Sequence, residues 1–168
     1  DLSCNDFEGI PIPSFIGSIG RLRNLNLSQA GFSGTIPHQL GNLTMLRYLG
    51  LGGTTTNYGY LDLGSIVNFN VLQLHGDNLQ WLSGLHSLQH LDMLRVDLSK
   101  ALDWLQVINA LPSLTELHMS SCELKYVPPS FSINFTSLAI LDLSCNEFES
   151  SVFGWMFKSP SFPRYQWM

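Results

Sequence analysis

Leucines recur along the chain in a fixed arrangement of hydrophobic and polar positions, L-x-x-L-x-L-x-x-N-x-L/F. The clearest copy contains Leu22, Leu25 and Leu27, with Phe32 and Ile36 further on. Successive copies begin at Leu22, Leu46, Phe69, Leu88, Leu114 and Leu138. A partial copy covers residues 1–21 and another begins at residue 162, so we interpret all 168 residues as a single repeat array.

The L-x-L core of each copy alternates with period two, which predicts a short strand with its leucines inward and its x residues outward. The Asn position can satisfy backbone groups where the chain bends. Apolar residues at helical spacing over residues 101–111 predict a short helix on the convex side. Stacked copies bury their leucines only against their neighbours. We therefore predict an α/β-type solenoid, a right-handed superhelix with a short-stranded parallel sheet on the concave face and irregular, 3-10 or helical returns.

The repeat is degenerate between Leu51 and Leu88. Residues 54–59, TTTNYG, have the composition of a loop. We interpret the remainder as one further turn through Phe69, Leu72, Leu74, Asp77 and Leu79. The alternative is an insertion that has no repeat structure.

Some repeats carry a signature beyond the leucines. Gly34-Thr35-Ile36-Pro37 is followed by Leu40-Gly41-Asn42-Leu43, and this G-x-I-P arrangement closely resembles the plant-specific leucine-rich repeat. Residues 77–85, DNLQWLSGL, and 103–109, DWLQVIN, are similar to the N-terminal half of plant receptor-like proteins, which are membrane-anchored ectodomains of pathogen perception and development. Receptor kinases and secreted inhibitors of microbial wall-degrading enzymes (polygalacturonase-inhibitor-like) use the same repeat and are the alternatives.

This resemblance implies a ligand-binding protein on the extracellular side of the plasma membrane, or secreted to the cell wall. Its concave face would bind a peptide, a protein or a glycan. The resemblance also implies cysteine-stapled caps, a membrane anchor and a co-receptor kinase in the full-length protein. The chain begins and ends within a repeat, so we expect a fragment that meets the membrane only through segments absent from it. No cofactor is expected.

Composition narrows the range of partners. The net charge is −5, and the eight Lys and Arg residues are scattered, which argues against nucleic-acid binding. No run of 18 apolar residues is present. Cys4, Cys122 and Cys145 are odd in number and lack the C-x-x-C spacing of a zinc site, so at least one is unpaired within the chain.

The outward strand positions form two columns on the predicted concave face. One column holds Asn26, Gly50, Gln73, Asp92, His118 and Asp142. The other holds Asn24, Tyr48, Val71, His90, Glu116 and Ile140. Aromatic, basic and acidic groups on adjacent strands suit contact with a peptide or a glycan. We therefore predict a ligand-binding patch made of Tyr48, His90, Asp92, Arg95, Glu116, His118 and Asp142.

Carboxylates and imidazoles in this patch are also the groups of metal and catalytic sites. A metal needs its ligands about 2.1 Å from one point, and we expect flat strands to splay these side chains apart. No metal site is predicted for this reason. The sequence contains no G-x-S-x-G elbow, phosphate loop or H-E-x-x-H motif, so no catalytic residue and no enzyme activity are predicted either.

Asn-x-Ser/Thr sequons begin at Asn26, Asn42 and Asn134. Asn42 and Asn134 occupy the same position in their repeats, in the turn before a strand, and we predict glycans there. Asn26 lies on a strand and faces outward, where a glycan would block one end of the concave face. An unmodified asparagine is the alternative at that position.

Overall fold

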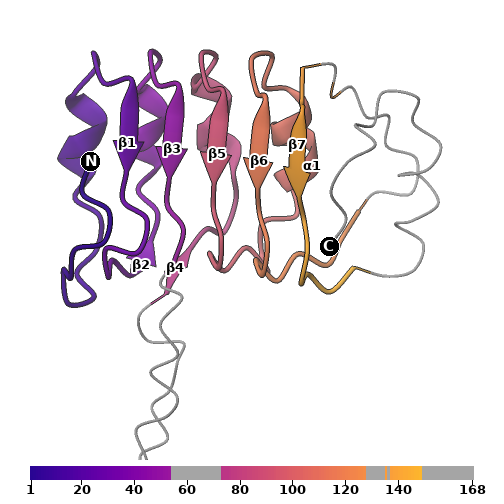
Figure 1. Ribbon diagram of the computed structural model, residues 1–168, viewed down its shortest axis with the longest axis horizontal. Helices are drawn as coiled ribbons and strands as arrows, with labels where there is room; N and C mark the ends of the chain where they lie inside the picture. The colour runs from indigo at the N-terminus through magenta and orange to yellow at the C-terminus, as the bar shows by residue number, and fades with distance from the viewer. Residues whose placement is uncertain (54–72, 128–134, 136, 149–168) are drawn as a thin grey trace, which may run out of the picture.

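The computed structural model describes residues 1–53, 73–127, 135 and 137–148 of the chain. Short parallel strands lie side by side in one sheet, with the helical segments behind them (Figure 1). The sheet has the order β1 (Asn24–Asn26), β3 (Tyr48–Gly50), β5 (His90–Asp92), β6 (Glu116–His118) and β7 (Ile140–Asp142). The predicted solenoid with a parallel sheet on its concave face is confirmed.

The returns are helical, and they stack like the strands. The 3-10 helix η1 (Ser14–Ser18) packs on η2 (His38–Asn42), η2 packs on η5 (Gln80–Gly84), and η5 contacts α1 (Trp104–Asn109). Helix α1 lies within the residues 101–111 for which a helix was predicted. Among the described residues, no helix is long and apolar enough to cross a membrane.

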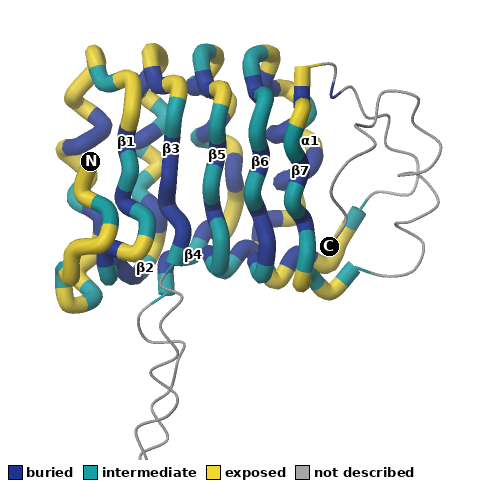
Figure 2. Tube along the Cα trace, viewed as in Figure 1, coloured by how far each residue is buried: buried dark blue, intermediate teal, exposed yellow. Residues whose placement is uncertain are grey.

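The core follows directly from the alternation in each strand. The central leucines of the five sheet strands pair in register and are buried; they are Leu25, Leu49, Leu91, Leu117 and Leu141. Each buried leucine contributes about 2 kcal/mol through removal of its side chain from water. Buried and partly exposed positions alternate along the strands, so the outward side chains remain available on the concave face (Figure 2).

A repeat beginning at Phe69 was expected to add a strand to the main sheet between Tyr48 and His90, and the described strands differ from that expectation. Strand β3 pairs directly with β5, with Tyr48 opposite His90, so none of the described strands lies between them. Gln73 therefore does not belong to the concave column in which it was placed. Phe69, Val71 and Leu72 lie outside the described residues.

Leu74 and the residues after it complete the coil that began at Leu46. Strand β4 (Leu74–His75) pairs with β2 (Gly34–Thr35) in a second, two-stranded sheet below the first. Leu79 and η5 then return the chain to β5. The alternative interpretation, an insertion that has no repeat structure, concerns residues that lie mostly outside the described ones, and it stays a prediction. The leucine spacing predicted a new strand at Leu74 because the leucines in the second half of a coil have a spacing similar to those that begin a coil.

A candidate recognition site on the concave face

Strand register brings four of the predicted residues together. Tyr48 lies opposite His90, His90 opposite Glu116, and His118 two residues beyond Glu116 on the same strand. We call Tyr48, His90, Glu116 and His118 the concave cluster. Because β3 pairs directly with β5, Tyr48 and His90 are direct neighbours rather than two strands apart.

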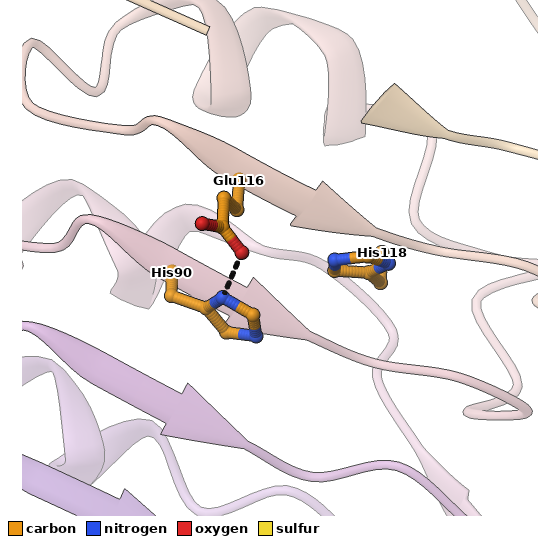
Figure 3. Close-up of side chains that lie close together, drawn as sticks. All are labelled: His90, Glu116 and His118. Atoms are coloured by element: carbon orange, nitrogen blue, oxygen red, sulfur yellow. Dashed lines mark hydrogen bonds and ion pairs between the residues drawn. The ribbon is translucent and has the colours of Figure 1, made fainter. Parts of the chain in front are cut away.

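The side chains of the concave cluster contact one another. The rings of Tyr48 and His90 stack with centroids 4.5 Å apart and planes inclined by 16°. The Nδ1 atom of His90 lies 2.7 Å from the Oε2 atom of Glu116, and the His118 ring lies beside them, with its centroid 5.3 Å from that of His90 (Figure 3). Adjacent parallel strands are about 4.8 Å apart, a spacing at which planar side chains in one row stack.

Partial burial distinguishes this cluster from a solvated surface. The His90 side chain is 24% exposed and that of Glu116 is 39% exposed, so the hydrogen bond between them is partly shielded from water. Burial, followed by the negative charges of Asp92 and Glu116, raises the pKa of the Tyr48 phenol above its usual value. The phenol therefore stays protonated at neutral pH and can donate a hydrogen bond to a ligand.

Asp92 and Asp142 have a structural task that the sequence analysis missed. The Oδ1 atom of Asp92 accepts a hydrogen bond from the backbone N–H of Leu94 at 2.9 Å, and Asp142 does the same with Ser144 at 3.0 Å. These are Asx turns, in which a short polar side chain bonds the backbone two residues further on. In the sequence, these turns are indicated by the L-D-L pattern at the end of a strand, just before a bend. Both carboxylates face the concave side but are partly occupied with the turn.

Arg95 lies in the bend after β5 rather than on the strand. Its φ of 59° is in the left-handed region, which Gln29, Ser121 and Cys145 also adopt in their own coils. Each of these residues follows the last residue of its strand by three positions, so the bend is a repeated feature of the solenoid. Arg95 is therefore at the margin of the predicted patch and outside the concave cluster.

The three possible metal-binding side chains do not splay apart as predicted. Ligand atoms of His90, Glu116 and His118 all lie within 4.8 Å of one another. The expectation of divergence treated the strands as flat and ignored the pairing of His90 with Glu116, which draws the side chains of two strands toward each other.

A polar hollow lies elsewhere, beside β4, and is lined by His75, Asp77, Asp97 and Lys100. Burial alone would raise the pKa of Asp97, but hydrogen bonds from Ser99 and the charges of His75 and Lys100 outweigh burial and lower it. Lys100 Nζ lies 3.5 Å from Asp77 Oδ1. Lys100 and Asp77 thus already engage each other within this hollow.

The sequons differ in exposure. Asn42, at the end of η2, is exposed, as is Thr44. The side chain of Asn26 accepts a hydrogen bond from the backbone N–H of Ser28 at 3.0 Å, in the same Asx turn as the aspartates. Asn134 lies outside the described residues.

Comparison with known proteins agrees with the repeat and the fold. The Leucine Rich Repeat family profile matches residues 21–43 and 113–134. Receptor-like proteins EIX1 and EIX2 of Solanum lycopersicum are 41% and 43% identical to this chain over 162 residues, which is 94% of the chain. The chain spans 14% of the length of each.

Among solved structures, that of a TDR receptor superimposes with a TM-score of 0.65 at 25% identity, covering 88% of this chain and 22% of that one. The matched repeats, the identity along nearly the whole chain and the solenoid fold lead to one conclusion. The chain is a solenoid of leucine-rich repeats that is similar to a segment of plant receptor-like proteins.

Proposed function

We propose that this chain is the ligand-recognition part of a plant cell-surface receptor-like protein that acts in defence or developmental signalling. The observation that carries the proposal is the concave cluster, where Tyr48, His90 and Glu116 restrict one another by direct contact. Groups that are fixed in advance lose little conformational entropy on binding. Both tomato relatives are receptor-like proteins, which favours a receptor over a secreted enzyme inhibitor.

The chemistry of the cluster indicates the class of ligand. Tyr48 and His90 present a flat π surface, and Glu116 adds a carboxylate beside it. Such a surface suits a peptide or protein segment with a cationic or amide-rich side chain that stacks on the rings and donates to the carboxylate. A glycan, which also stacks on aromatic rings and donates hydroxyl groups, is the alternative that the experiment separates. We also propose a co-receptor kinase as a partner of the full-length receptor. This proposal rests on the similarity to plant receptor-like proteins.

Site-directed photo-crosslinking tests this proposal. A benzoylphenylalanine is placed at Tyr48 in one variant and at Phe15 in another; Phe15 is an aromatic residue of η1 that is 67% exposed on the helical side. Each purified variant is irradiated in apoplastic fluid from infected and uninfected leaves. We expect adducts from position 48 that position 15 does not give, and mass spectrometry identifies them as protein or glycan. Equal adducts from both positions, or none from position 48, contradict recognition by the concave face.

An extracellular location implies passage through the secretory pathway. We propose that Asn42 carries a glycan, since both Asn42 and Thr44 are exposed. Expression in plant leaves followed by peptide mapping should show a glycopeptide at Asn42 that disappears in Asn42→Gln. An unmodified Asn42 in the secreted chain contradicts this assignment.

A further inference from the structure

The concave cluster contains a set of side chains that recognition of a peptide does not by itself require. His90 lies on β5, and Glu116 and His118 lie on β6, two residues apart and therefore on the same face of that strand. One ligand atom from each residue lies within 4.8 Å of the other two. Figure 3 shows the Glu116 carboxylate turned toward the His90 ring, with the His118 ring to one side of them.

Two imidazoles and one carboxylate form the donor set of open zinc sites, in which a fourth position is left for water or substrate. Imidazole nitrogen also suits copper and nickel, whereas calcium and magnesium prefer oxygen ligands throughout. The chemistry of the donors thus selects a transition-metal ion over the hard cations.

The distances are close to those that such an ion needs. Zinc bonds of about 2.0–2.1 Å in a tetrahedron place neighbouring ligand atoms about 3.4 Å apart. The structure holds the ligand atoms within 4.8 Å of one another on two paired strands, and we expect side-chain rotation to supply the remaining contraction. Tyr48 stacks on the other side of the His90 ring and restricts its rotation. The ion competes with the His90–Glu116 hydrogen bond, which must open to admit it.

We propose that His90, Glu116 and His118 bind a divalent transition-metal ion, Zn²⁺ or Cu²⁺, with its remaining coordination position open on the concave face. This goes beyond the proposed function, because the ion binds to the chain alone.

Calorimetric titration of ZnCl₂ into the chelator-stripped chain tests the proposal, with CaCl₂ as the hard-cation comparison. The exposed thiols of Cys4 and Cys145 are alkylated first so that they do not bind the metal. The variants are His118→Ala and the isosteric Glu116→Gln. His86→Ala is the matched control, because His86 is exposed and follows η5 on the helical side. Circular dichroism melts verify that each variant is folded.

We expect one Zn²⁺ per chain, no heat of binding from Ca²⁺, a loss of more than about tenfold in zinc affinity in both cluster variants, and no change in His86→Ala. Co²⁺ in place of zinc should give the intense visible absorption of a four-coordinate ion, and Glu116→Gln should weaken it. Absence of saturable binding, or the same affinity in Glu116→Gln as in the unmodified chain, overturns the proposal. Because no protein ligand is present in the titration, such a result leaves the proposed recognition function intact.

Discussion

At the residue scale, the Asn position of the repeat links one coil to the next. The Oδ1 atom of Asn146 accepts hydrogen bonds from the backbone N–H groups of Cys122, at 2.9 Å, and Leu124, at 3.0 Å. Its Nδ2 donates to the carbonyl oxygens of Met119 and Leu143. One side chain thus satisfies the backbone groups of two coils at the bend, as the sequence pattern predicts for this position.

Asn146→Ala should therefore lower the free energy of unfolding by about 2 kcal/mol, because it leaves partly buried N–H and C=O groups without their partner. Asn24→Ala is the control, since Asn24 is exposed at the start of β1 and its replacement should change stability by less than about 0.5 kcal/mol. Urea unfolding followed by circular dichroism measures both. Equal stability of the two variants would show that the asparagine is not needed for the bend.

Cys122 occupies the same position one coil earlier, but its side chain satisfies fewer backbone groups than that of Asn146. Its buried thiol donates to the carbonyl oxygen of Met93, with the Sγ atom 2.9 Å from that oxygen. Burial raises the pKa of the Cys122 thiol to about 12, so the folded state keeps the thiol protonated where an exposed cysteine ionises. This contribution to stability is complete below the ordinary cysteine pKa and is lost as the pH rises toward 12.

Because the thiolate is the reactive species, Cys122 should resist alkylation at pH 8 while the exposed Cys4 and Cys145 react. Mass spectrometry after iodoacetamide treatment should find Cys122 modified only when the chain is unfolded in urea. Modification of Cys122 at the same rate as Cys4 in the folded chain contradicts the burial described above.

At the scale of elements, glycines set the distance between the stacked 3-10 helices. A Cβ atom on Gly41 in η2 would overlap the carbonyl oxygen of Trp81 in η5, and one on Gly17 would overlap that of Gln39. Neither carbonyl can move without displacing its helix. The small residues thus allow the coils to stack as closely on the helical side as they do in the sheet.

Gly41→Ala should lower the unfolding free energy by about 2 kcal/mol, because an overpacked side chain here meets backbone rather than a flexible side chain. Gly20→Ala is a matched control: a Cβ there has no atom within 4 Å, and the loss of a glycine from the unfolded ensemble makes it neutral or slightly stabilising. Chemical denaturation compares the two. A Gly41→Ala variant as stable as Gly20→Ala would contradict the close approach of η2 and η5.

The elements show which parts of the fold follow from sequence and which do not. Period-two leucines placed the five sheet strands, and helical spacing placed α1, since both depend on local burial. The same leucine spacing placed Leu74 in a strand of the main sheet. Strand pairing shows instead that Leu74 belongs to β4, which pairs with β2 in the second sheet. The concave cluster was predicted as a column, but its contacts depend on the direct pairing of β3 with β5. The Asx turns of Asp92 and Asp142 required the geometry of the bend.

At the scale of the whole molecule, the side chains that stabilise the solenoid differ from those that its concave face presents to solvent. Inward leucines and the glycines of the helical side hold the coils together, and outward side chains of the sheet that do not bond the turns can vary without loss of the core. The concave cluster lies on β3, β5 and β6, in the middle of the sheet order, where neighbouring strands flank it on both sides. A ligand bound there would contact several coils at once.

The affinity of the partner recovered by crosslinking at position 48 tests this account most directly. Surface plasmon resonance compares the unmodified chain with Tyr48→Ala/Glu116→Ala, and with Phe15→Ala/Leu102→Ala, two exposed residues outside the sheet. We predict a Kd at least about thirtyfold weaker for the first pair, in keeping with the loss of two central contacts, and an unchanged Kd for the second. An affinity that survives the first pair of substitutions, or falls equally with the second, would contradict recognition through the concave cluster.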